Sequence, residues 1–161
     1  MIKRSVEAGI VLQILDLANQ LKRKGDIICQ KLGITTQQWL ILLHLANDPN
    51  LPYLERAHPK KPIMASELAD SLSVSRANIT NLLTTLMQKN LIAQIEDEED
   101  RRIKRLVLTE QGRDIVELIE PDRNTYNGIF LEHFSDIEKD QFFSFLQDCA
   151  NQLNALALPT T

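Results

Sequence analysis

The sequence predicts an α+β fold that is mainly α-helical and carries one small β-hairpin. Apolar residues recur at the spacing of an amphipathic helix near both ends of the chain. Between these ends, two short helical segments meet at a tight turn, and two apolar segments then flank a charged tip. Because 161 residues suit one domain with a substantial core, we expect residues 1–161 to form a single domain.

The N-terminal part of the chain predicts two helices and a loop. Residues 5–30 form the first helix, because their apolar positions recur every three or four residues. Thr35-Thr-Gln-Gln38 predicts a capping box, so the second helix begins there and ends near Asn47-Asp-Pro49. Residues 48–62 contain four prolines, and we expect them to form an exposed loop.

The middle of the chain predicts a helix-turn-helix followed by a hairpin. One short helix spans residues 65–72, and Ser75 caps the next, at residues 76–89. Residues 91–95 and 103–108 are predicted strands on either side of a polar tip. Together these elements predict a winged helix-turn-helix, in which the hairpin is the wing.

Two further helices are predicted at the C-terminal end. Thr109 caps the first of them with help from Glu110, and Ser135-Asp-Ile-Glu138 is a capping box for the last. The apolar stripe of the last helix consists of Phe142, Phe145, Leu146, Cys149, Leu153 and Leu156. The first and last helices can bury their stripes against each other or against a second chain, and periodicity alone does not separate these two interpretations.

The helix predicted at residues 76–89 has an apolar face and a polar face. Its apolar face consists of Ile79, Leu82, Leu83, Leu86 and Met87, which we expect to pack on the core. The opposite face, called the recognition face below, consists of Ala77, Asn78, Thr80, Asn81, Thr84, Thr85 and Gln88. It contains no acidic side chain and can therefore approach DNA without repulsion.

An α-helix fits the major groove, where Asn pairs with adenine and a small apolar group contacts the thymine methyl. Ala77, Asn78 and Asn81 are therefore the predicted base contacts, and Ser75, Arg76 and Thr80 the predicted phosphate contacts, with Thr84 beside them. An ordinary solvent-exposed helix face has a similar composition, so the hairpin decides between the two interpretations.

Four basic residues lie at the hairpin tip and just after it, namely Arg101, Arg102, Lys104 and Arg105. They favour a phosphate-binding surface, and an arginine on a thin hairpin suits the narrow minor groove of A·T stretches. We expect Arg101 or Arg102 to insert there, with Asp100 orienting the guanidinium group. The alternative is a solvated turn whose charges neutralise one another, since the tip also contains Glu96, Asp97, Glu98 and Glu99.

Charge is distributed unevenly along the chain. The net charge of −4 alone would argue against nucleic acid. However, residues 1–113 hold 16 basic and 13 acidic side chains, whereas residues 114–161 hold 2 and 9. The acidic excess lies in the C-terminal third, so the helix-turn-helix and wing remain suited to a DNA backbone.

Several segments resemble the multiple-antibiotic-resistance regulator (MarR) family of winged helix-turn-helix transcriptional regulators. They are Ser66-Glu-Leu-Ala-Asp-Ser-Leu72, Ser75-Arg-Ala-Asn-Ile-Thr80, Leu91-Ile92, Asp97-Glu-Glu-Asp-Arg-Arg102 and Leu108-Thr-Glu-Gln-Gly112. The resemblance implies a regulator that binds a pseudo-palindromic operator as a homodimer, and we expect a bacterial-type repressor. We also expect a cytoplasmic protein, because Glu7, Gln13 and Asp16 interrupt the apolar residues after the charged start and no small-residue cleavage site follows. Recognition helices would enter successive major grooves, and Arg102 the minor groove, oriented by Asp100.

The resemblance also implies a division of the chain and a class of effector. Residues 1–34 and 113–161 would form the dimerisation helices, and residues 35–112 the DNA-binding region. Family members often release DNA on binding small phenolic or lipophilic acids, for which the predicted lining residues are Trp39, Leu43, His44 and Tyr53. Family members often have arginine where Asn81 stands, and the loop at 48–62 is longer than is usual in the family.

Two cysteines, Cys29 and Cys149, are far apart and form no CxxC motif. Some members of the family sense peroxide through a cysteine near the start of the first helix, whereas Cys29 lies near its end, so the placement does not match. We therefore expect both to be buried, inert thiols, and redox sensing by Cys29 is the alternative.

The sequence argues against several other classes of protein. It has no GxGxxG, P-loop or GxSxG motif, so an enzyme is not expected. Its histidines are scattered, so neither a metal site nor a cofactor is expected. No apolar segment is long enough for a membrane span. The remaining alternative is a winged helix that contacts or dimerises with proteins and binds no DNA, which would need an apolar patch in place of the basic wing.

Overall fold

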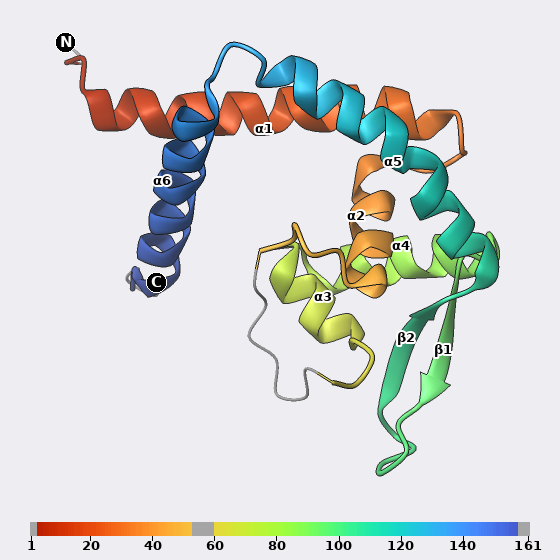
Figure 1. Ribbon diagram of the computed structural model, residues 1–161. Coiled ribbons are helices and arrows are strands. Elements are labelled where there is room, and N and C mark those ends of the chain that lie inside the picture. The colour runs from red at the N-terminus through yellow and green to blue at the C-terminus, as the bar shows by residue number, and fades with distance from the viewer. Residues whose placement is uncertain (1–2, 53–59, 158–161) are drawn as a thin grey trace. The chain divides into compact units, whose positions relative to one another are not determined.

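The computed structural model describes residues 3–52 and 60–157, and in them it contains six helices and one two-stranded sheet (Figure 1). The elements are α1 (Val6–Gln30), α2 (Thr36–Ala46), α3 (Ala65–Ser71), α4 (Arg76–Gln88), β1 (Ile92–Glu96), β2 (Lys104–Leu108), α5 (Glu110–Phe130) and α6 (Asp136–Ala155). The predicted α+β class and winged helix-turn-helix are therefore confirmed. No described helix combines the length and apolar character that a membrane crossing requires.

The predicted capping residues are present where helices begin. The Thr35 hydroxyl accepts a hydrogen bond from the Gln38 amide, and the Gln38 side chain accepts one from the Thr35 amide. At the start of α4 the Ser75 hydroxyl accepts from the Asn78 amide, and at the start of α5 the Thr109 hydroxyl accepts from the Gly112 amide. Each cap satisfies an amide that has no partner within its helix, which fixes where the helix begins.

The chain divides into two compact units, Met1–Glu120 and Pro121–Thr161. The boundary falls inside α5 at Pro121, which has no amide hydrogen for a helical hydrogen bond. In the first unit, Leu42, Leu68, Leu86 and Leu106 are fully buried, one each from α2, α3, α4 and β2. This core joins the helix-turn-helix to the wing.

The wing is an antiparallel hairpin in which Ile92 pairs with Leu108 and Glu96 with Lys104. It extends away from α2 and α4 of the same unit (Figure 1). The predicted loop at 48–62 is described only in part, and the two residues that follow it make strand-like contacts that the sequence did not predict. The Ile63 carbonyl accepts a hydrogen bond of 2.9 Å from the Leu106 amide, and Met64 forms a bridge with Arg105. Residues 63–64 therefore pair with β2 on the edge opposite β1.

Gly112 allows the first turn of α5 to approach the base of the wing. A β-carbon at this position would lie 2.1 Å from the Leu91 carbonyl oxygen, which is a backbone atom. The same carbonyl accepts a hydrogen bond from the Thr109 amide. A larger side chain at position 112 therefore has to displace the backbone.

We predict that Gly112→Ala lowers the free energy of unfolding by roughly 1–3 kcal/mol, the range typical of overpacking, although alanine favours helices more than glycine does. Urea unfolding at a fixed protein concentration measures it. Asp114→Ala, at an exposed position of the same helix, is the control and is expected to stay within about 0.5 kcal/mol. An equal effect of both substitutions would contradict the close approach.

Candidate nucleic-acid interface

The recognition face of α4 points outward. Ile79, Leu83 and Leu86 are buried on the opposite side of the helix, as predicted. Of the predicted contact residues, Ser75, Arg76, Ala77, Thr80, Asn81 and Thr84 are exposed, and Asn78 is half-buried. Packing of the apolar face thus fixes which side chains α4 presents to solvent.

Hydroxyl groups at the start of α4 differ in what they can still donate. The Thr80 hydroxyl donates to the Arg76 carbonyl oxygen over 2.8 Å, so its proton is engaged within the helix. The Ser75 hydroxyl accepts from the Asn78 amide over 3.1 Å, which leaves its own proton for a phosphate oxygen. The geometry therefore favours Ser75 over Thr80 as a phosphate donor.

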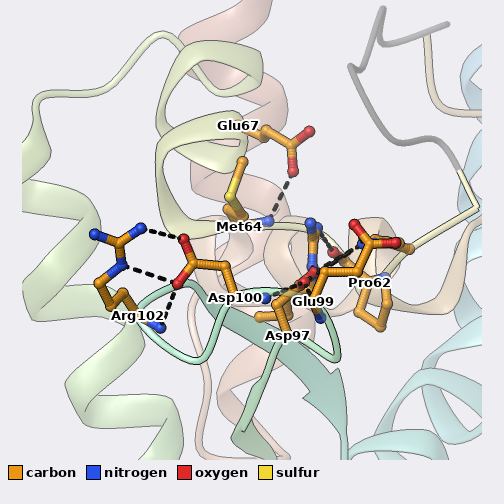
Figure 2. Close-up of polar contacts among 9 residues, drawn as sticks. Pro62, Met64, Glu67, Asp97, Glu99, Asp100 and Arg102 are labelled. Atoms are coloured by element: carbon orange, nitrogen blue, oxygen red, sulfur yellow. Dashed lines mark hydrogen bonds and ion pairs between the residues drawn. The ribbon is translucent and has the colours of Figure 1, made fainter.

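Arg102 and Asp100 form the predicted charge-assisted pair at the tip of the wing (Figure 2). Arg102 Nε donates to Asp100 Oδ1 over 3.0 Å, and Nη2 donates to Oδ2 over 2.8 Å. The Arg102 amide donates to Oδ1 as well. These bonds lower the pKa of Asp100 and raise the pKa of Arg102. The Arg102 side chain is nevertheless 89% exposed, so its remaining donors can reach a ligand.

Three acidic side chains of the tip are paired with basic ones. Glu96 lies 2.8 Å from Lys104 Nζ, and Glu99 lies 2.9 Å from Lys61 Nζ. Asp97 is buried and pairs with Arg105. These pairs reduce the repulsion that the acidic cluster would otherwise exert on phosphate groups.

Arg105 is not part of the exposed basic surface, and its prediction as a phosphate-binding residue was wrong. It is 2% exposed and donates to Asp97 and to the Pro62 carbonyl oxygen. The sequence analysis missed the contacts of Arg105 because it expected residues 48–62 to form an exposed loop and counted Arg105 among the basic residues that face phosphate. The available signal was a pair of opposite charges, Asp97 and Arg105, on the two sides of the same hairpin.

An open cavity of about 530 Å³ lies in the first unit, between the end of α2, β2 and the start of α5. Of the four predicted effector residues, His44 lines it, Trp39 packs against the core and Leu43 is buried. Tyr53 lies outside the described residues. Of the three that the structure describes, His44 alone lines this cavity.

The two cysteines differ in environment. Cys29 is buried at 1% exposure, as predicted, and burial, together with the nearby charge of Asp26, raises the pKa of its thiol to about 11. Cys149, on α6, is exposed in the single chain, so the prediction of a buried thiol was wrong there. Its apolar neighbours on α6 are exposed as well.

The helix-turn-helix, the outward recognition face and the basic wing together define a winged helix-turn-helix protein. The family model described as "MarR family" matches residues 32–103. The chain is 30% identical over 134 residues to the transcriptional activatory protein BadR of Rhodopseudomonas palustris, covering 83% of this chain and 71% of that protein. It is 25% identical over 153 residues to the transcriptional repressor YetL of Bacillus subtilis, covering 93% and 86%.

Solved structures show the same fold. A MarR/EmrR family transcriptional regulator from Acinetobacter sp. ADP1 superposes with a TM-score of 0.77 at 25% identity, over 95% of this chain and all of that one. MepR of S. aureus, in a complex with DNA, superposes with a TM-score of 0.74 at 23% identity, over 92% and 99%. The chain belongs to the MarR family of transcriptional regulators.

We predict that Cys29 stays unmodified in the native protein at pH 7, because a pKa near 11 leaves almost no thiolate. Mass spectrometry after iodoacetamide treatment checks this, with urea-unfolded protein as the control in which Cys29 reacts. Oxidation of native Cys29 by peroxide, accompanied by a change in DNA affinity, would instead support redox sensing.

Proposed function

We propose that this chain binds a pseudo-palindromic double-stranded DNA operator as a homodimer and thereby regulates transcription. One observation carries the proposal: a recognition face without acidic side chains lies in the same unit as a wing with an exposed, oriented Arg102. The DNA complex of MepR, a protein of the same fold, supports it. Residues 35–112 form the DNA-binding region in this proposal, and residues 1–34 and 113–161 the dimerisation helices.

Each part of the interface has its own role in this proposal. Ala77, Asn78 and Asn81 contact base edges in the major groove, where an Asn side chain pairs with adenine. Ser75 and Arg76 hold phosphates that position the helix. Arg101 and Lys104 add positive charge near the phosphates, and Thr80 and Thr84 lie beside the phosphate contacts as uncharged members of the recognition face. Arg102 enters the minor groove beside Asp100.

The proposed dimer follows from apolar side chains that a single chain leaves in solvent. On α1, Ile10, Val11 and Leu15 are 52%, 57% and 57% exposed. On α6 no residue is buried, and Phe145 is 64% exposed. Apolar patches of this extent mark interfaces, and α-helical stripes suit a second copy of the same chain. A dimer also places two recognition helices about 34 Å apart, one turn of DNA.

We propose that the chain represses transcription. A dimer bound to an operator excludes other proteins from that DNA by occupying it, and it needs no additional surface that contacts those proteins. Relatives named as an activator and as a repressor both match the chain, so the position of the operator would decide. A reporter gene behind the selected operator tests this: lower expression with the protein present supports repression, and higher expression supports activation.

We further propose that a small lipophilic or phenolic acid releases the DNA. The cavity beside His44 has apolar lining residues, Ile63 and Val116 among them, and more basic than acidic ones. The basic residues are Lys60, Lys61 and Arg113 and the acidic one is Glu117, a balance that suits an anion with an apolar body. A panel of such acids is expected to include one that raises the melting temperature and weakens operator binding. No shift with any member would count against an effector of this class.

We predict that selection from a random double-stranded DNA pool enriches one palindromic site with half-sites about one helical turn apart. Arg102→Ala is expected to weaken binding to that site by roughly 10-fold or more, since a desolvated arginine contact is lost. Absence of enrichment and of salt-dependent binding would instead favour the winged helix that binds only proteins.

We predict that Phe145→Glu shifts the protein towards monomer, because the new carboxylate would have to be buried at the interface without a partner. The residue is exposed in the single chain, so the substitution is expected to spare the fold of each chain. Gln147→Glu adds the same charge two residues away and is the control. Sedimentation velocity distinguishes them, and an unchanged dimer in Phe145→Glu would place the interface elsewhere.

A further inference from the structure

A cluster of buried and half-buried charges lies at the tip-proximal end of the hairpin and is not part of the proposed DNA contacts. It joins Asp97 and Arg105 of the wing to Lys61 and Pro62 of the preceding segment (Figure 2). Arg105 Nε donates to Asp97 Oδ2, and Arg105 Nη1 donates to the Pro62 carbonyl oxygen over 2.8 Å. Lys61 Nζ lies 3.3 Å from Asp97 Oδ2 and 2.9 Å from the Glu99 carboxylate.

Asp97 also holds the backbone of the tip. Its Oδ1 accepts hydrogen bonds from the amides of Glu99, at 2.9 Å, and Asp100, at 3.2 Å. Asp100 in turn holds the Arg102 side chain through both carboxylate oxygens. A continuous series of hydrogen bonds therefore leads from Arg105, through Asp97 and the backbone of Asp100, to the guanidinium group of Arg102.

Burial distinguishes this pair from the other ion pairs of the tip. The side chains of Arg105 and Asp97 are 3% and 2% exposed, whereas Lys104 and Glu96 are 47% and 55% exposed. Exposed ion pairs are screened by solvent and hold no fixed geometry. A buried ion pair whose hydrogen bonds are all made keeps a fixed geometry. These bonds also hold the pKa of Asp97 well below its usual range, so it stays charged at neutral pH.

We propose that Asp97 and Arg105 are positioning residues that fix the wing tip, so that Arg102 is presented to the minor groove in one orientation. The inference rests on the proposed function, since it concerns how the same interface achieves its affinity. It predicts that the pair affects DNA binding through Arg102 and not through its own charges, both of which are buried.

Simple electrostatics gives the opposite expectation, which makes the inference testable. Asp97→Asn removes one negative charge from the wing, and repulsion of phosphates alone predicts tighter DNA binding. Loss of positioning predicts weaker binding. Glu98→Gln removes the same charge from an exposed neighbour and serves as the matched control.

The experiment is a double-mutant cycle on the selected operator, measured by fluorescence anisotropy with circular dichroism as a check on folding. Asp97→Asn is expected to weaken binding about 10-fold when Arg102 is present and less than about 3-fold in Arg102→Ala, because coupled residues are not additive. Glu98→Gln is expected to leave affinity unchanged or slightly higher. A purely structural role of Asp97 would give the same loss in both backgrounds.

A second variant covers the case in which Asp97→Asn does not fold. Arg105→Lys keeps the charge facing Asp97 but lacks the planar fork that also reaches Pro62. It is expected to weaken binding several-fold, again only when Arg102 is present. This inference alone would be overturned if the substitutions weakened DNA binding equally with and without Arg102. It would also be overturned if they left DNA affinity unchanged while Arg102→Ala weakened it. Failure of the unmodified protein to bind DNA would overturn the proposed function and this inference with it.

Discussion

Burial of the apolar face of α4 is the constraint on which the rest of the interface depends. Ile79, Leu83 and Leu86 lie in one core with residues of α2, α3 and the wing. Since that core fixes the rotation of α4 about its axis, it determines that Ala77, Asn81 and Thr84 of the recognition face are exposed to solvent. The same core includes Leu106 of β2, so the recognition helix and the wing are placed relative to one another by a single set of contacts.

Polar contacts, rather than apolar packing, hold the tip of the wing in place. Its tip carries both signs of charge, and a tip held only by exposed ion pairs would sample many conformations. The buried Asp97–Arg105 pair and the Pro62 carbonyl bonded to it connect the tip to residues that precede the helix-turn-helix. The acidic residues of the wing are thus compatible with the proposed contact to DNA, because they orient basic residues or are neutralised by them.

Local signals in the sequence were sufficient for the elements. Capping residues such as Thr35 and Ser75, together with helical spacing, placed the helix starts to within about one residue. The charges of the tip predicted that Asp100 pairs with Arg101 or Arg102, the family resemblance singled out Arg102, and Arg102 is the partner observed. The opposite charges of Asp97 and Arg105 on one hairpin could have indicated that the two side chains pair, but not that Arg105 is buried. Its burial depends on the Pro62–Met64 segment lying along β2, a contact between distant parts of the chain. Cys149 was misassigned because a helical stripe does not reveal whether its own chain covers it.

The most direct test of the account is dimethyl sulfate footprinting of the protein on its selected operator, since this reagent methylates guanine N7 in the major groove and adenine N3 in the minor groove. We expect N7 protection in two half-sites about one helical turn apart and adjacent N3 protection that disappears in Arg102→Ala. Minor-groove protection that persists without Arg102, or the absence of paired major-groove protection, would contradict it.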